Sequence, residues 1–402
     1  MKQFWLTIRT DIGSLPRPVY ILVFGQFINR LGAFVYPFLS LYLTEKGYAL
    51  VLVSGVLAAI AGGNLLGPIV GGYLSDAIGR RNTIVLSLAG SSVSLISVYY
   101  SDGYVTLLVT AAIYGFSSFL FGPPSNALIA DLVTADSRIT AYTLMRLAIN
   151  LGFAVGPMVA GVLYMTSPML IFVGDAATTM VFAVLAFCML PHGLRTVKGK
   201  VSSPKVVLKS WGDALSSVNR NYEYKQFLLA IFLMGIAFCQ IFSLLALTTR
   251  EAGISPKVYG IVMGFNGLLI VLVEIPLIQY IKRFESRKVL AIGYVLVGIG
   301  CALFGVVDSM MGFFLAMFVF TIGEIVALPI GMAYSSNLAP EKFRGRYFGL
   351  RGMTWALSNL AGSLGLWGYG VFGPTWWLMA GIFAVVAAVA ISSRQAEGVC
   401  SV

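Results

Sequence analysis

The chain has 402 residues, of which 58% are hydrophobic and only 11% are charged, with a mean hydropathy of +0.88 and a formal net charge of +11. Soluble domains carry about 25% charged residues, and a soluble fold of this size could not keep so much apolar surface away from water. The composition therefore excludes an ordinary soluble domain and predicts that lipid surrounds most of the chain.

Apolar runs of ~20 residues or more, long enough to span a bilayer, follow one another along the chain. Six of them lie at 18–43, 50–75, 83–101, 104–133, 138–166 and 168–191. Six more lie at 226–249, 257–281, 288–307, 310–338, 346–372 and 375–394. We therefore predict an all-α membrane protein with twelve transmembrane helices. Its domains would be an N-terminal six-helix bundle at 1–191, a linker at 192–225 and a C-terminal six-helix bundle at 226–402.

Lysine and arginine are distributed unevenly over the connections between these runs. Twelve spans place both termini and the linker on one side, and 23 of the 27 Lys and Arg residues lie on that side. By the positive-inside rule the termini and the linker are cytoplasmic. The excess positive charge follows from this topology, so we expect no nucleic-acid partner. We expect a multi-pass protein of the inner cell membrane that works as a monomer in the lipid bilayer.

The connection between spans 2 and 3 reads GGYLSDAIGRRN, from Gly71 to Asn82. Its glycines allow a tight reversal of the chain and a close approach of two helix ends. Asp76 lies at the membrane border, where it can meet the positive N-terminal end of another helix. Arg80 and Arg81 can reach a carboxylate or lipid headgroups. Without further information, this is also what an ordinary loop with positive-inside charges looks like.

This loop resembles the signature loop of the major facilitator superfamily in residue types, spacing and position after span 2. The resemblance covers essentially the whole chain and implies two pseudo-symmetric six-helix bundles. In that family the loop aspartate latches the two halves together on the cytoplasmic side, and one arginine pairs with an acid at the end of span 4. The residues that carry this gate motif here are Gly72, Asp76, Gly79, Arg80, Arg81 and Asp131. The corresponding loop of the second half, QYIKRFESRKVL, keeps mostly the basic charges.

A second resemblance lies in span 5, where the chain reads GFAVGPMVAG. This is similar to the glycine–proline motif of the drug:proton antiporter branches, and its residues here are Gly152, Gly156, Pro157 and Gly161. Glycines four residues apart flatten one helix face for close packing, and proline bends the helix. Ordinary helix packing uses the same pattern. One departure is Ala111, which occupies the span 4 position where the family often has an arginine linked to proton transfer.

Ionisable residues inside the spans are the candidates for coupling, because they are costly in lipid. Arg30 lies near the middle of span 1 and Glu324 near the middle of span 10. Dehydration favours a neutral carboxyl and a nearby guanidinium favours a charged one, so Glu324 is the first candidate for a proton carrier. A static Arg30–Glu324 ion pair is the alternative. Glu274 in span 8 is a candidate gate or packing residue. Asp175 in span 6 is a candidate for a structural role.

Spans 1, 4, 7 and 10 line the central cavity in the fold that this chain resembles. Polar residues occur at similar depth in all four spans, as binding near the midplane requires. The predicted cavity residues are Gln26, Asn29, Arg30, Ser117, Ser118, Gln240, Ser243 and Glu324.

The function that these features favour is proton-driven export of small amphipathic compounds, a multidrug-type antiport by alternating access. The alternative is a proton-coupled carrier of one metabolite, such as a sugar, a peptide-like compound or a siderophore. A receptor or scaffold would leave the midplane charges without a use. We expect no enzyme, no cofactor and no metal site, because no nucleophile–base motif, phosphate-binding loop or ligand cluster is recognisable.

Overall fold

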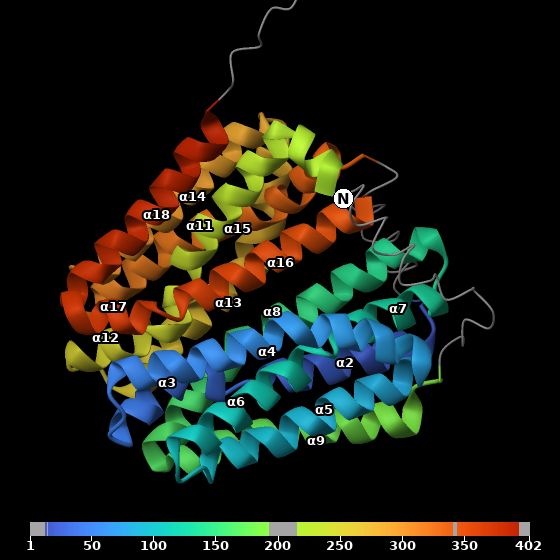
Figure 1. Ribbon diagram of the computed structural model, residues 1–402, viewed down its shortest axis with the longest axis horizontal. Coiled ribbons are helices and arrows are strands. Elements are labelled where there is room, and N and C mark those ends of the chain that lie inside the picture. Colours follow the sequence, from blue (N-terminus) through green and yellow to red (C-terminus); the bar gives the residue numbers. More distant parts are fainter. Residues whose placement is uncertain (1–12, 14, 193–214, 341–343, 394–402) are drawn as a thin grey trace, which may run out of the picture. The chain divides into compact units, whose positions relative to one another are not determined.

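The computed structural model describes residues 13, 15–192, 215–340 and 344–393, and these residues form helices and no strand (Figure 1). The helices of the first half are α2 (Arg17–Leu31), α3 (Val35–Glu45), α4 (Leu50–Ala77), α5 (Arg80–Tyr99), α6 (Tyr104–Phe119), α7 (Gly122–Leu132), α8 (Ala135–Thr166) and α9 (Pro168–Met189). Those of the second half are α11 (Tyr222–Ser243), α12 (Leu245–Glu251), α13 (Pro256–Ile281), α14 (Ser286–Phe304), α15 (Met310–Leu338), α16 (Arg344–Gly362), α17 (Gly365–Phe372) and α18 (Trp376–Ser392).

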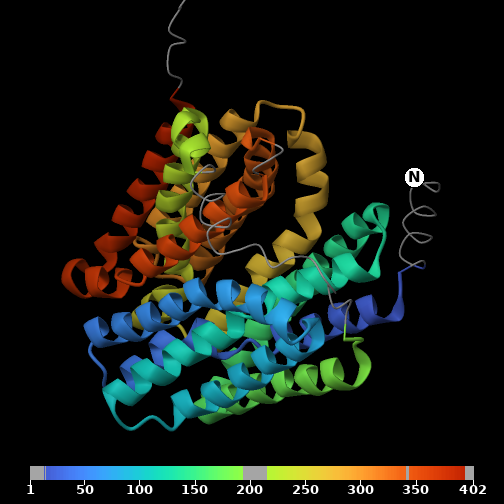
Figure 2. The same ribbon diagram turned by 45° about the vertical axis from the view of Figure 1, so that its right-hand side comes forward.

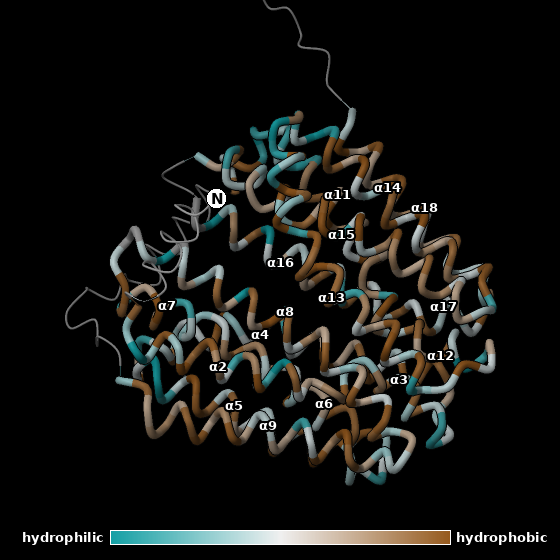
Figure 3. The backbone as a smooth tube through the Cα atoms, turned by 180° about the vertical axis from the view of Figure 1, so that it is seen from behind, coloured by the Kyte–Doolittle hydropathy of each residue, from teal (hydrophilic) through white to brown (hydrophobic). Residues whose placement is uncertain are grey.

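Eleven stretches of the described chain are long and apolar enough to cross a membrane. The last of them, Arg346–Ser392, has 47 residues and contains α16, α17, a 3-10 turn at Gly373–Thr375 and α18. A crossing needs ~20 residues, so this stretch holds two crossings, and the prediction of twelve helical spans is confirmed. Apolar residues cover most of α14 and α18, as the brown tube in Figure 3 shows.

Four of the twelve crossings are interrupted. Span 1 breaks between α2 and α3, span 4 between α6 and α7, span 7 between α11 and α12, and span 11 between α16 and α17. A break exposes backbone N–H and C=O groups that lipid cannot satisfy, so other parts of the protein must pair them. Sequence periodicity did not predict these breaks.

By their contacts the described residues form two compact units. The first contains the residues of Met1–Gly199 and Thr249–Val271, and the second those of Lys200–Thr248 and Leu272–Val402. The first part of α13 therefore packs with the N-terminal helices. The predicted domain limits at 191 and 226 stay a prediction, and most of the predicted linker, residues 193–214, lies outside the described residues.

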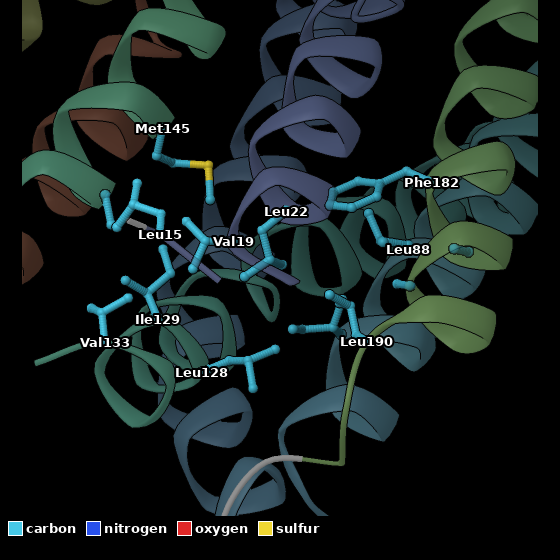
Figure 4. Close-up of a cluster of buried hydrophobic side chains, with 14 residues drawn as sticks. Leu15, Val19, Leu22, Leu88, Leu128, Ile129, Val133, Met145, Phe182 and Leu190 are labelled. Carbon is cyan, nitrogen blue, oxygen red and sulfur yellow. The ribbon is translucent and has the colours of Figure 1, made fainter. Parts of the chain in front are cut away.

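In the first unit α5 packs on α9 and α6, and α2 packs on α8 and α9 (Figure 2). A buried apolar cluster joins α2, α5, α7, α8 and α9 near one end of these helices; Figure 4 labels ten of its members, among them Leu22, Leu88, Leu128, Met145 and Phe182. Phe182 is fully buried and its ring lies against Gly25 of α2, where a larger side chain would collide with it. The ring thus fills a site that only glycine leaves open.

Helices α4 and α6 approach each other through glycines. A Cβ atom added at Gly67 would lie 2.6 Å from the carbonyl oxygen of Phe116, and one at Gly71 would lie 2.5 Å from that of Leu120. Asn64 lies on the same helix, and with its amide nitrogen directed at α6 it donates to the carbonyl of Gly115 at 2.9 Å. Because lipid tails are as apolar as the side chains, such close backbone packing and interhelical hydrogen bonds drive association within the membrane.

In the second unit α14 packs on α15 and α18, and α11 packs on α16 and α18. Gly298 and Gly381 face each other across α14 and α18, each within 3 Å of the other's carbonyl oxygen if a Cβ atom is added. Trp377 is completely buried and donates its indole N–H to the Thr248 hydroxyl at 2.9 Å, which ties α18 to α12. A buried indole N–H needs such an acceptor.

We predict that Gly67→Ala destabilises the protein by about 1–3 kcal/mol, because the new methyl group meets backbone that cannot turn aside. The matched control is Gly62→Ala in the same helix, where an added Cβ atom has nothing within 4 Å. Thermal unfolding in detergent should show a lowered midpoint for the first variant alone. Equal midpoints for the two variants would mean that α4 and α6 do not need this close contact.

Candidate functional site

The turn between α4 and α5 is held by one buried guanidinium. Gly79 has φ +95°, a conformation that favours glycine, and the next residue, Arg80, begins α5 with only 8% of its surface exposed. Arg80 donates to the Ser75 hydroxyl at 2.8 Å, pairs with Asp131 of α7 at 3.4 Å, and also pairs with Asp76. The arginine thereby links the ends of spans 2, 3 and 4.

Asp76 and Arg81 lie at the surface of this turn. Asp76 keeps 69% of its side chain exposed although it pairs with Arg80, so the pairing leaves much of its carboxylate accessible. Arg81 hydrogen-bonds with the ring of His192 at 2.6 Å and stacks over Phe187 of α9 at 5.3 Å. Contact of Asp76 with span 11 would join the two units and stays a prediction.

The second unit has its own guanidinium at the corresponding turn between α13 and α14. Arg287 donates to the Tyr334 hydroxyl of α15 at 2.8 Å and pairs with Glu223 of α11 at 3.1 Å. The loop has no GRR motif, so the sequence did not predict this link. A tyrosine one turn before the end of span 10 and an acid in the first turn of span 7 were the signals that could have indicated it.

The span 5 glycines lie where backbones meet. A Cβ atom added at Gly152 would lie 2.8 Å from the carbonyl oxygen of Phe27, and one at Gly156 would lie 2.8 Å from that of Leu31, both in α2. Gly161, one turn beyond Pro157, faces α13 instead, where its Cβ atom would lie 2.6 Å from the carbonyl oxygen of Pro256. One helix thus packs on two others through a single motif.

The facing part of α13 is also rich in glycine. Gly260 lies against the carbonyl of Pro157, and Gly264 and Gly267 lie against Ala154. Tyr259, buried in this contact, donates to the carbonyl of Pro37 at 2.9 Å, in the first turn of α3. The start of span 8 is therefore fitted onto spans 1 and 5.

A polar cluster lies at the end of α4 that is opposite to Asp76. Glu45, the last residue of α3, accepts a hydrogen bond from the Tyr164 hydroxyl of α8 and pairs with Arg250 of α12 at 3.7 Å. The Tyr164 ring stacks on Phe38 at a centroid distance of 5.4 Å. This cluster was not predicted, because its acid, tyrosine and arginine lie more than 80 residues apart along the chain.

The break in span 1 is completed by a carboxylate from another helix. Asp175 of α9 is 5% exposed, and it accepts a hydrogen bond from the N–H of Val35, the first residue of α3, at 3.1 Å. The Asn29 amide donates to the Thr179 hydroxyl, one turn along α9 from Asp175, at 2.9 Å. Arg30 lies in the last turn of α2 with its side chain exposed and within electrostatic reach of Asp175.

The remaining predicted cavity residues differ in their surroundings. Gln26 is buried, the Ser118 hydroxyl bonds with that of Ser91 at 2.9 Å, and Ser117 faces Gly90, also in α5. Gln240 is fully buried and donates to the carbonyl of Gly362 at 3.0 Å, at the break in span 11. The hydroxyl of Ser243 bonds to the backbone of its own helix.

The two acidic candidates belong to the second unit. Glu324 in α15 and Glu274 in α13 are both half-buried. Arg30 belongs to the first unit, so the pairing of Arg30 with Glu324 stays a prediction, as does the part of each cavity residue in binding.

The fold and these motifs agree with the comparison of the chain with known protein families. The sequence profile of the Major Facilitator Superfamily matches residues 22–272 and 227–397. The chain belongs to this superfamily. The resemblance drawn from the loop motif is thereby confirmed, and the protein is a multi-pass membrane transporter of small molecules rather than an enzyme.

Individual relatives are distant but extend over most of the chain. The chain is 26% identical to the uncharacterized MFS-type transporter YqjV of Bacillus subtilis, over 88% of this chain and 85% of that protein. It is 24% identical to a Na(+), Li(+), K(+)/H(+) antiporter of Planococcus maritimus, over 92% and 94%. It is 22% identical to the multidrug resistance protein MdtH of Yersinia pestis, over 86% and 85%.

Solved structures show the same fold at lower identity. A variant of the nucleoside transporter NupG superposes with a TM-score of 0.81 at 13% identity, covering 93% of this chain and 98% of that one. A peptide transporter of the POT family superposes with a TM-score of 0.75 at 17% identity, covering 96% and 97%.

We predict that Gly161→Ala loosens the contact between α8 and the start of α13 by about 1–3 kcal/mol, a ~5–150-fold change in the population of the packed arrangement. The amides of residues 252–262 should then exchange with deuterium faster than in the unsubstituted protein. Val162→Ile is the matched control, since it adds the same single carbon at a neighbouring position that is 49% exposed. Unchanged exchange in Gly161→Ala would contradict a tightly fitted contact.

Proposed function

We propose that the protein exports small amphipathic compounds across the inner membrane in exchange for protons. The observation that carries this proposal is the packing of the span 5 motif. Gly152 and Gly156 meet the backbone of α2, and Gly161 meets that of α13. The motif resembles that of the drug:proton antiporter branches, and its glycines occupy contacts that no larger residue could make.

The direction of transport is supported by the relatives. The antiporter of Planococcus maritimus and MdtH of Yersinia pestis match almost the whole length of the chain. Their names describe cation–proton exchange and multidrug resistance, and from these names we infer export as the direction of transport for this chain. Neither identity exceeds 24%, so the substrate of this chain is a proposal of its own.

The orientation follows from the charges. We place the α4–α5 turn and both termini on the cytoplasmic side, because 23 of the 27 Lys and Arg residues lie on that side. The cluster of Glu45, Tyr164 and Arg250 then lies on the outer side. Alternating access requires contacts at each end that form and open in turn. The arginine-centred turn and the outer cluster are the candidate contacts for the two ends.

Proton coupling is assigned to ionisable groups within the spans, with Glu324 as the principal carrier, Arg30 as its modulator and Glu274 as the next candidate. A carboxyl at this depth changes its charge only when its surroundings change, which is what a switch of access provides. The resemblance to the family implies an arginine linked to proton transfer in span 4, and this chain has Ala111 at that position, so other groups must transfer the proton here.

The second candidate function is the proton-coupled transport of one anionic metabolite. The exposed guanidinium of Arg30 at a break in span 1 favours it, because arginine binds carboxylates in a two-pronged geometry. The solved structures that share the fold include peptide and nucleoside transporters. A panel of amphipathic cations and small carboxylates, assayed in proteoliposomes with an imposed proton gradient, would separate the two functions.

We predict that Glu324→Gln abolishes uphill transport driven by a proton gradient but leaves downhill exchange of substrate. Glutamine keeps the volume and hydrogen-bonding capacity of the side chain, yet it cannot gain or lose a proton. The measurement is substrate accumulation in inverted vesicles with and without the gradient. Full accumulation by Glu324→Gln would remove this residue as the coupling site and make Glu274 the next residue to test.

We predict a different result for Arg30→Ala, in which transport should have its optimum at higher pH or lose its coupling. In the predicted pair, loss of the guanidinium leaves burial of the Glu324 carboxyl unopposed, which favours its neutral form. The effects of Arg30→Ala and Glu324→Gln should not add in the double variant, because coupled residues deviate from additivity by about 0.5–3 kcal/mol. If both single variants misfold and the double variant recovers, the two residues form a static structural pair instead.

A further inference from the structure

The first unit contains a buried carboxyl that the proposed proton carrier does not involve. Asp175 lies in the first half of α9, 5% exposed, among helices that belong to the membrane-spanning part of the chain. Charged groups in such places are rare and costly and generally serve a function. Its surroundings therefore need an explanation beyond packing.

The ionised form of this carboxyl is stabilised by several groups at once. The N–H of Val35, the first residue of α3, donates to its Oδ2 at 3.1 Å, and the neighbouring N–H of Phe34 also favours the carboxylate. Phe34 is the N-cap of α3 and supplies no side-chain cap, so Asp175 replaces that cap from another helix. The N-terminal end of a helix carries a partial positive charge that favours an anion. The Thr179 hydroxyl also favours the carboxylate.

The charged and titratable groups that face this site are few among the described residues. Arg30 of α2 and Tyr114 of α6 interact electrostatically with each other and with Asp175. Tyr36 of α3 interacts electrostatically with Tyr114. From α5 the Ser92 hydroxyl donates to the carbonyl of Ala176, the residue after Asp175, at 2.8 Å. Arg30 is thus the one cation that these contacts bring to the carboxyl, and its side chain is exposed.

We propose that Asp175 is a proton-binding site, and that its protonation both weakens the cap of α3 and leaves the charge of Arg30 uncompensated. This inference rests on the proposed proton-coupled export and adds a second site to it. Removal from water favours the neutral carboxyl, whereas the α3 N–H groups and Arg30 favour the carboxylate. Because these influences oppose each other, a change in hydration at the break can decide which form is present.

Protonation changes the site in two ways. The carboxyl gains an O–H donor and loses its negative charge, so it accepts more weakly from the first turn of α3. The anion that balanced Arg30 is also lost, so the exposed guanidinium acts as a net positive charge on the same face. A cationic substrate is then repelled where it was tolerated before. A proton on Asp175 and a cationic amphipathic substrate would therefore exclude each other from the same region, although they bind to different atoms. Mutually exclusive binding of proton and substrate is what an antiporter requires.

The first test is a pH titration by infrared spectroscopy of the purified full-length protein in nanodiscs. The carbonyl stretch of a protonated carboxylic acid should appear in the wild type between about pH 5 and 9, the range in which a coupling group must titrate. Asp175→Asn should lose one such component, while Glu324→Gln keeps it. A difference spectrum between wild type and Asp175→Asn without any titrating component in this range would overturn the proposal.

The second test measures binding of tetraphenylphosphonium, a lipophilic cation, as a function of pH. Binding to the wild type should weaken as the pH falls, and binding to Asp175→Asn should lose this dependence. If Asp175→Asn does not fold, Thr179→Val decides, because it removes one donor to the carboxylate and keeps the carboxyl. Its infrared transition should shift upward by roughly 0.5–1 pH unit, and an unshifted transition would contradict the proposal.

The two hypotheses fail in different ways. If wild-type vesicles exchange substrate for protons but Asp175→Asn shows the same pH dependence as wild type, the site at Asp175 is wrong and the proposed function stands. If wild-type vesicles show no proton-coupled transport of any compound in the panel, the proposed function fails. In that case an infrared transition assigned to Asp175 would still establish a proton-binding site in the span 1 break.

Discussion

Close approach of helix backbones is the constraint on which the rest of this structure depends. In lipid no hydrophobic gain drives helices together, so contact must come from atoms that fit within van der Waals distance. Glycines at Gly67, Gly71 and Gly115 meet this requirement between α4 and α6, and Gly298 and Gly381 meet it between α14 and α18. At such interfaces the glycines leave no side chain between the two helix backbones.

The polar contacts are arranged around these apolar interfaces, mostly at helix ends and breaks. Arg80 and Arg287 each tie three spans together at one end of a unit, and Glu45 joins α3, α8 and α12 at the other end of the first unit. Within the membrane, Asp175 and Gln240 pair backbone groups at the breaks of spans 1 and 11. A broken helix thus provides positions where one side chain controls a bend, which an unbroken helix does not offer.

Much of this could be predicted from the sequence, because length and hydropathy determine which segments cross a membrane. Twelve spans, the tight turn at Gly79 and the packing face of span 5 all follow from local patterns of apolar residues, glycine and proline. The breaks could not be predicted in this way, since α2 and α3 together read as one apolar run. Nor could the caps of those breaks, because Asp175 lies 140 residues from Val35 and nothing local indicates their meeting. Of the predicted cavity residues, Ser118 and Gln240 form hydrogen bonds with neighbouring helices. Whether a side chain faces a neighbouring helix or the cavity depends on the rotation of its helix, and the prediction used only its depth in the membrane.

The first unit is discontinuous along the chain, because residues 249–271 belong to it. This has a consequence for biosynthesis. The N-terminal six spans emerge from the ribosome and enter the membrane before span 8 exists, so the face of α8 around Gly161 must first be covered by lipid. The final contact can form only after the linker and span 7 have been inserted. Maturation of the N-terminal half therefore waits for the C-terminal half, and a product truncated between the two would leave Gly161 without the backbone of α13 that it contacts.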